Sequence, residues 1–156
     1  MATDEKTKNE AYKKMAALCS RSEQCTPDIR KKLTTFGLNE DETEEVLENL
    51  KGEKFIDDNR YSKAYVTEKF RINKWGRIKI RYQLKAKGLD EQTIQTGLDS
   101  LDEEKYKAAL LKTMKEKARK VKKKNKFEKM GQIIRFAQSR GYEPELIHRF
   151  MNEVIE

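Results

Sequence analysis

The sequence predicts an all-α protein built from three tandem three-helix units that form an elongated, curved array. Three observations support this fold class: a segment recurs three times, apolar residues recur at helical spacing, and turn-forming residues are scarce. Only seven glycines and two prolines occur among 156 residues, so we expect long helices joined by short turns. With 36% hydrophobic and 40% charged residues, the chain can bury thin seams between helices rather than one thick core.

The repeat is a gapless alignment of three segments, which begin at Ile29, Ile80 and Ile133 and are therefore offset by 51 and 53 residues. The same position of each segment holds a glycine: Gly37, Gly88 and Gly141. Glycine is the residue that most readily takes the left-handed conformation that ends a helix. We therefore expect a positive φ angle at all three glycines, with one helix before and one helix after each turn.

The first unit is predicted to span residues 1–56. Its first amphipathic helix runs from about Lys8 to Ser20, and its second starts at Thr26-Pro27, where proline suits a first-turn position. Asn39 can cap the third helix, and Glu42 completes a capping box with it. The sequence "NEDETEEVLE" makes this third helix acidic.

The second unit is predicted to span residues 57–103. Its first helix runs from about Arg60 to Ile72, and Asp90 can cap its third helix. Asp57 and Asp58 precede the first helix. Capping of that helix is the favoured interpretation of this acidic pair, because no second acidic cluster accompanies it to form a metal or catalytic site.

The third unit is predicted to span residues 104–156 and to open with a long basic helix from about Lys105 to Lys124. The run from Lys112 to Lys129 holds ten basic residues and two acids. The helix macrodipole accounts for a few lysines at a C-terminus, and phosphate contact is the alternative explanation for the full density. The chain is therefore acidic early and basic in its middle and late parts.

Composition also limits the classes of function. The net charge of +8 favours a polyanion, an anionic membrane face or an acidic protein as partner. No apolar run is long enough to span a bilayer, and the N-terminus lacks the apolar core of a signal peptide, so we expect a cytoplasmic protein. Cys19, Cys25 and the distant His148 do not form a metal-ligand pattern, and no glycine loop suits a phosphate. We therefore expect no cofactor and no enzymatic activity.

The middle helix of the second unit has two apolar stripes. Ile80 and Leu84 lie one turn apart and form the first stripe. Trp75, Ile78 and Tyr82 form the second, on the nearly opposite side, and only this unit has such a second stripe. Two interpretations stay open: the second stripe packs against a neighbouring unit, as in a repeat array, or it binds a partner.

The same region is strongly basic. The stretch from Lys69 to Leu89 holds eight Lys or Arg residues and no acid, so pairing within the stretch cannot neutralise them. Arg77, Arg81 and Lys85 lie along one edge between the two stripes. We expect them to form an exposed basic edge, which either contacts an anion or is only a solvated surface.

Two stretches of the second unit, "FIDDNRYSKAYV" and "KWGRIKIRYQLKAKGL", resemble the signature of the RecX family of regulatory proteins. The matching positions are an acidic pair, an Arg-aromatic-small step, and a spaced Gly, Ile, Leu and Lys-Gly: Asp57, Asp58, Arg60, Tyr61, Ser62, Ala64, Gly76, Ile80, Leu84, Lys87 and Gly88. Tyr61 and Ser62 replace the more usual Phe and Ala. The third unit departs most, with Ala137 where the other two have Leu.

The resemblance implies a non-catalytic modulator of the RecA recombinase. Such a protein binds in the groove of RecA–DNA filaments, inhibits ATP hydrolysis and strand exchange, and promotes filament loss. The partners implied are the RecA filament and single-stranded or double-stranded DNA within or near it, with no membrane, and we expect a monomer. The alternatives are a general nucleic-acid-binding helical module, whose basic helices clamp phosphates, and a pure protein adaptor.

The basic and aromatic residues of the second and third units are the predicted contacts with partner or DNA. They are Arg60, Lys69, Arg71, Lys74, Trp75, Arg77, Lys79, Arg81, Tyr82, Lys85, Lys87, Lys115, Arg119, Lys122, Lys123 and Lys124.

Overall fold

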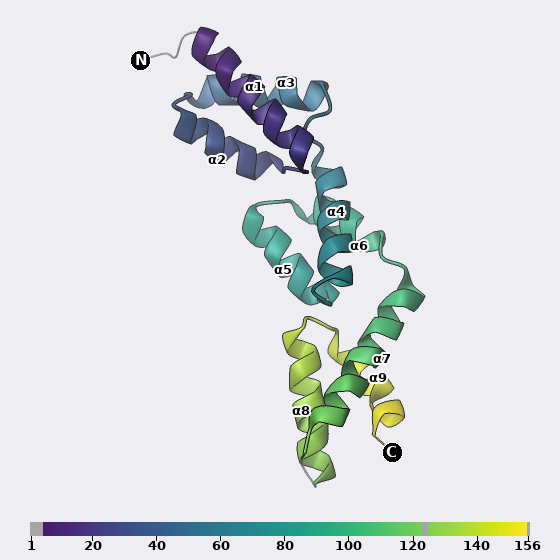
Figure 1. Ribbon diagram of the computed structural model, residues 1–156. Coiled ribbons are helices and arrows are strands. Elements are labelled where there is room, and N and C mark those ends of the chain that lie inside the picture. Colours follow the sequence, from purple (N-terminus) through teal and green to yellow (C-terminus); the bar gives the residue numbers. More distant parts are fainter. Residues whose placement is uncertain (1–4, 123–124, 156) are drawn as a thin grey trace.

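The computed structural model describes residues 5–122 and 125–155, and the regular structure within these ranges is entirely α-helical (Figure 1). The helices, in chain order, are α1 (Glu5–Arg21), α2 (Thr26–Phe36), α3 (Glu40–Gly52), α4 (Asp58–Arg71), α5 (Arg77–Lys87), α6 (Glu91–Asp99), α7 (Glu103–Lys120), α8 (Lys126–Ser139) and α9 (Pro144–Val154). They follow one another in groups of three along an elongated, curved array. The all-α repeat prediction is confirmed.

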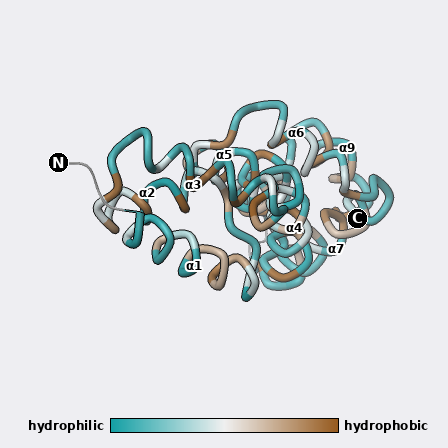
Figure 2. The backbone as a smooth tube through the Cα atoms, turned by 90° about the horizontal axis from the view of Figure 1, so that it is seen from above, coloured by the Kyte–Doolittle hydropathy of each residue, from teal (hydrophilic) through white to brown (hydrophobic). Residues whose placement is uncertain are grey.

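Three separate hydrophobic clusters stabilise the array. The first is formed by α1–α3 around Ile29, Leu33 and Leu47, the second centres on α4–α6, and the third is formed by α7–α9. Short apolar stretches interrupt a mostly hydrophilic chain (Figure 2), as expected for seams between helices rather than one thick core. The unit boundaries at 56/57 and 103/104 stay a prediction.

The glycine turns have the predicted backbone conformation. The φ angles of Gly37, Gly88 and Gly141 are 102°, 100° and 96°. Each turn is closed by backbone hydrogen bonds; for example, the N–H of Leu89 donates to the carbonyl of Leu84 at 3.3 Å. This geometry ends α2 and α5 and returns the chain toward the same seam.

Capping residues fix the starts of most helices. Asn39 and Glu42 form the predicted capping box, and the carboxylates of Asp57 and Asp90 accept backbone N–H groups of their own helices. Asp102 does the same for α7, accepting from the N–H of Lys105 at 2.9 Å. Because these acids stand directly before the helices, α4 and α7 begin two residues earlier than the apolar pattern suggested.

Two predictions about local structure are wrong. Asp58 does not cap α4; its Oδ1 accepts the N–H of Thr26 at 2.8 Å and so caps α2 of the preceding unit. Helix α7 ends at Lys120 rather than Lys124, because Val121 takes an extended conformation (φ −80°, ψ 123°). Lys122 therefore lies beyond the helix.

The joint between the first and second units combines a buried apolar side chain with polar contacts. Cys25, at the start of α2, is fully buried within the second hydrophobic cluster. Beside it, the Lys87 Nζ lies 3.1 Å from Asp28 Oδ2. A Cβ on Gly88 would lie 3.4 Å from Pro27, so the turn of the second unit touches the first turn of α2.

At the first joint, Asp58 of the second unit caps α2 of the first. At the joint between the second and third units, groups of the third unit cap α5 in the same way. The first N–H groups of α5 are orphan donors, as at any helix start. Those of Gly76 and Ile78 donate to the carbonyls of Arg140 (2.7 Å) and Gly141 (2.9 Å). The N–H of Arg77 donates to the Tyr106 hydroxyl at 2.9 Å. In both joints, the next unit therefore caps the middle helix of the unit before it.

Candidate partner interface

Helix α5 has one buried and one exposed apolar face. Ile80 and Leu84 are fully buried, as predicted. Ile78 and Tyr82, on the other face, are 51% and 71% exposed. The neighbouring units meet α5 only near its ends, so packing against a neighbour, one of the two open interpretations, does not hold for these two side chains.

Trp75 behaves differently from the rest of its stripe. It is half-buried and packs against the second hydrophobic cluster. The ammonium groups of Lys69 and Lys79 lie 5.2 and 4.7 Å from its ring centroid, and that of Lys69 also lies 5.5 Å from the ring of Tyr65. These cation–π contacts hold two of the predicted contact lysines beside the indole.

The prediction of an exposed basic edge at Arg77, Arg81 and Lys85 is wrong for its first member. The Arg77 guanidinium is only 24% exposed, pairs with Glu143 at 2.7 Å and with Glu103, and lies 3.9 Å from the ring centroid of Tyr106. Arg77 is therefore part of the joint with the third unit.

Arg81 and Lys85 share one carboxylate. Arg81 pairs with Glu91 of α6, and Lys85 lies 3.8 Å from the same group while remaining 71% exposed. The acids that pair with Arg77, Arg81 and Lys85 all lie outside the stretch from Lys69 to Leu89. The spacing of residues within that stretch therefore could not reveal them. Of the three, Lys85 alone is mainly exposed.

Two further predicted contact residues hold the first joint. Arg60 Nε lies 2.7 Å from Glu23 Oε2, and its guanidinium also donates to the carbonyl oxygens of Lys54 and Phe55. Partial burial opposes the charged form of Lys87, but the interactions with Asp28 and Tyr61 together outweigh it and raise the pKa of Lys87 to about 12. These side chains connect units within the array.

The remaining predicted residues are exposed, and no carboxylate of the described ranges pairs with them: Arg71, Lys74, Lys115, Arg119 and Lys122. Lys123 and Lys124 lie outside the described residues. Sequence reasoning missed Lys117, Lys120 and Arg140, which gather near Lys74 at the second joint. The signal was present, because Lys117 and Lys120 stand three apart and thus on one helical face.

Charge is distributed by helix position within the unit, as well as along the chain. The third helices are acidic: α3 has six acids and one base, and α6 has two acids and no base. The middle helix α5 has five bases and no acid, and α7 has seven bases and three acids. The middle helices α2, α5 and α8 follow one another along one side of the array (Figure 1). The exposed apolar pair Ile78 and Tyr82 belongs to the second of these helices, α5.

Within the part of the chain that the structure describes, no three His, Cys, Asp or Glu side chains gather where they could hold a metal ion. In the same ranges, no helix combines the length and the apolar character needed to cross a bilayer. Asp57 and Asp58 are both engaged in capping, on different helices.

The family profile described as "RecX, second three-helix domain" matches residues 57–98, the region of α4–α6. The chain is 31% identical over 152 residues to the regulatory protein RecX of Clostridium acetobutylicum, a match that covers 94% of this chain and 70% of that protein. The chain belongs to the RecX family.

Two RecX structures share its fold. RecX from Lactobacillus salivarius has a TM-score of 0.89 at 17% identity over 96% of this chain and 97% of that one. A second has a TM-score of 0.84 at 22% identity over 97% and 81%.

The first relatives extend beyond the region matched here. RecX of Clostridium tetani is 33% identical over 126 residues, which is 80% of this RecX chain and 57% of that protein. The corresponding match to RecX of Clostridium botulinum covers 60% of that protein. This RecX chain therefore spans somewhat more than half the length of these two relatives, which are both named regulatory proteins.

Proposed function

We propose that this chain is a non-catalytic regulator that binds, as a monomer in the cytoplasm, in the groove of RecA–DNA filaments. It inhibits ATP hydrolysis and strand exchange by RecA and promotes filament loss. The family assignment supports this role, because the sequence signature of the second unit coincides with the region that the RecX profile matches. An elongated array suits a filament, since it spreads weak contacts over several subunits.

The observation that carries the proposal is the outward face of α5. Ile78 and Tyr82 are exposed on a helix whose other apolar face is fully buried. Large apolar side chains surrounded by cations are typical of the energetic centre of a protein interface. Lys85 and Lys79 flank the pair on the same helix, so the face suits an apolar recess rimmed by acidic residues or phosphates. We assign this face to the contact with RecA.

A second candidate function is direct binding of nucleic acid by the basic end of α7 and the residues that directly follow it. Lys115, Arg119 and Lys122 are exposed, and within the described ranges no acid neutralises them. Unpaired cations on a helix end are suited to phosphate contacts that carry no sequence information. This property favours DNA contact within the filament, and it also suits a protein that binds free DNA without RecA.

Co-sedimentation with RecA filaments separates the two functions. We expect the chain to sediment with filaments formed on single-stranded DNA in the presence of nucleotide, and to inhibit RecA ATP hydrolysis. Replacing both exposed side chains, Ile78→Ser with Tyr82→Ser, should abolish sedimentation and inhibition. The matched control is Phe127→Ser, which removes another exposed hydrophobic side chain (82% exposed) from α8 and should change neither.

Two results would contradict the proposal. If the Ile78→Ser/Tyr82→Ser variant melts like the wild type and still inhibits RecA fully, the outward face of α5 is not the contact. If the wild type binds free DNA with a steep salt dependence but never binds RecA, the nucleic-acid-binding function replaces the proposed one.

A further inference from the structure

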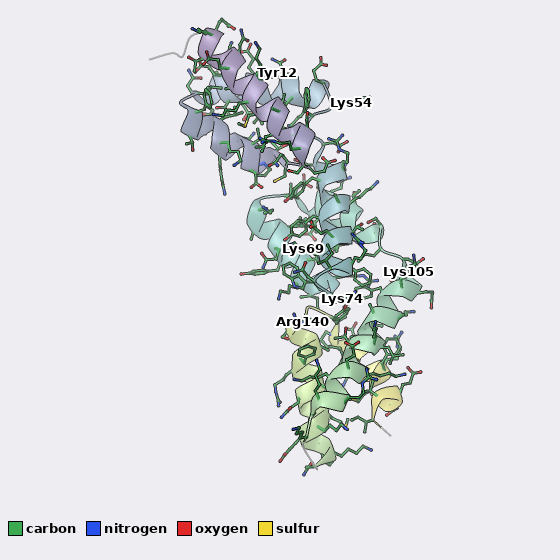
Figure 3. The ribbon with its side chains drawn as sticks, viewed as in Figure 1. Tyr12, Lys54, Lys69, Lys74, Lys105 and Arg140 are labelled. Carbon is green, nitrogen blue, oxygen red and sulfur yellow. The ribbon has the colours of Figure 1, made fainter. Side chains whose placement is uncertain are left out.

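A basic hollow lies at the joint between the second and third units. It encloses about 360 Å³ and is lined by Asn73 and Lys74 from the α4–α5 loop and by residues from the ends of α7 and α8. The latter residues are Thr113, Glu116, Lys117, Lys120, Phe136 and Arg140. Figure 3 shows Lys74 and Arg140 at this junction, whereas Lys105 lies at the opposite end of α7. The hollow is separate from the outward face of α5.

The hollow has an excess of positive charge. Four of its lining side chains are cations and one, Glu116, is an acid, which gives a net charge of +3. No ion pair within the described residues involves any of the four cations. The Lys117 ammonium and the Arg140 guanidinium lie 4.9 and 5.0 Å from the ring centroid of Phe136, which orients both without neutralising either.

Helix dipoles account for part of this charge. The C-terminal ends of α4 and α8 lie near the hollow, and Lys74 Nζ donates to the terminal carbonyl of Arg71 at 2.8 Å. Each helix C-terminus carries roughly half a negative elementary charge, so two ends offset roughly 1 of the +3. About two thirds of the excess charge therefore remains, and among the described residues the other two N–H groups of Lys74 have no partner.

Among the described non-glycine residues, Lys74 and Lys54 have a left-handed backbone, and only Lys74 lines the hollow. Its φ angle is 60°, a left-handed conformation that non-glycine residues seldom adopt. The strain persists because its carbonyl accepts the hydroxyl of Tyr142 at 3.1 Å while its ammonium caps α4. Such conformations occur preferentially where a side chain must be held in one place for function.

We propose that this hollow binds a phosphate group. Lysine ammoniums, an arginine guanidinium and the Asn73 amide together supply charged and neutral donors of the kind that coordinate phosphate oxygens. The phosphate belongs either to a free phosphate or to a nucleic-acid backbone, since the coordination is the same. A bound phosphate would bridge Lys74 of the second unit to Lys117, Lys120 and Arg140 of the third, and so stiffen the joint. The site does not depend on the proposed RecA contact.

Trp75, the single tryptophan of the sequence, follows Lys74 directly and serves as an internal probe. Titration with inorganic phosphate, against sodium chloride at equal ionic strength, should change its fluorescence in a saturable way. The double variant Lys120→Gln/Arg140→Gln removes two charged donors and should weaken phosphate binding by about tenfold or more. The matched control, Lys105→Gln/Lys112→Gln, removes the same charge from exposed positions of α7 outside the hollow and should bind like the wild type.

If the Arg140 change disturbs folding, as melting curves would reveal, Lys120→Gln alone provides the test because Lys120 is exposed. Competition with a short oligothymidylate distinguishes the two sources of the phosphate group, a free phosphate ion and a nucleic-acid backbone. If phosphate competes with it in the wild type but not in the variant, the hollow holds a backbone phosphate; if only free phosphate binds, that ion is the ligand. The proposal is overturned if phosphate and chloride act alike, or if the control pair weakens binding as much as the hollow pair.

Discussion

Alanine substitution at the three turn glycines separates the cost of backbone conformation from the cost of disrupting a joint. Gly37, Gly88 and Gly141 have nearly the same φ angle, so a side chain at each should cost about 1–2 kcal/mol through left-handed strain alone. The surroundings differ. A Cβ on Gly37 would meet no atom within 4 Å, and one on Gly88 would lie 3.4 Å from Pro27. On Gly141 it would lie 2.4 Å from Lys79 Cβ.

The expected order of destabilisation is therefore Gly37→Ala, then Gly88→Ala, then Gly141→Ala. Because the Cβ on Gly141 would also lie 2.6 Å from the backbone nitrogen of Lys79, rotamer changes cannot relieve the clash. The second and third units must separate, which breaks the hydrogen bonds from Gly76 and Ile78 to the third unit. Two hydrogen bonds at about 1–1.5 kcal/mol each place Gly141→Ala roughly 2–3 kcal/mol beyond Gly37→Ala.

Urea denaturation should be followed by circular dichroism for the whole array and by Trp75 fluorescence for the second joint. The two probes are needed because three separate cores need not unfold in one step. Gly76→Ala supplies a second test, because its Cβ would lie 2.4 Å from the Gly141 carbonyl oxygen. The double variant should cost less than the sum of the two single variants, since both open one joint. A Gly141→Ala cost within about 0.5 kcal/mol of the Gly37→Ala cost would refute this reasoning.

Three other predictions concern the second unit. Leu84→Ala should lower the free energy of unfolding by about 2–5 kcal/mol, whereas Lys85→Gln, at a mainly exposed neighbour, should change it by less than about 0.5 kcal/mol; equal urea midpoints would contradict this. Burial raises the pKa of the Cys25 thiol from 9.0 to about 11. The stability that the neutral, buried thiol contributes is therefore complete below pH 9 and is lost as the pH rises toward 11. The wild type should therefore lose about 1 kcal/mol more than Cys25→Ala between pH 8 and 10, and parallel thermal melts would disprove it. Ser62→Ala should stabilise the fold by about 1 kcal/mol in chemical denaturation, because the buried Ser62 hydroxyl has no hydrogen-bond partner among the described residues; a lower midpoint would count against this.

Features fixed by near neighbours in the chain could be predicted from the sequence. The turn at Gly88 depends on a residue that tolerates positive φ and on the helix before it, both visible in the repeat. The caps at Asn39 and Asp90 require a polar side chain three residues before the N–H that it accepts. The burial of Ile80 and Leu84 follows from their one-turn spacing.

Features fixed by contacts between units could not be predicted in the same way. Asp58 stands directly before α4, yet it caps α2, 32 residues earlier in the chain. Arg77 lies in a stretch without acids, yet it pairs with Glu103 and Glu143, 26 and 66 residues away. The pattern of a helix records which face is buried, but not which distant carboxylate reaches an exposed or half-buried cation. The fold was therefore predictable, and the list of free cations was not.

The contacts between units, which could not be predicted from the sequence, also matter for function. Each unit has its own hydrophobic cluster. The contacts that cross between units include hydrogen bonds, ion pairs, the contacts around Cys25, and the stacking of Phe70 on Tyr106 with ring centroids 5.7 Å apart. The relative placement of α5 and the basic end of α7 thus depends on the contacts of the second joint, which include the hydrogen bonds of Gly76 and Ile78 and the ion pairs of Arg77. A ligand that contacts both units must bind them in one relative orientation. A change that opens the second joint should therefore weaken such binding while Ile78 and Tyr82 stay chemically intact, which separates the contribution of the array's shape from that of its contact residues.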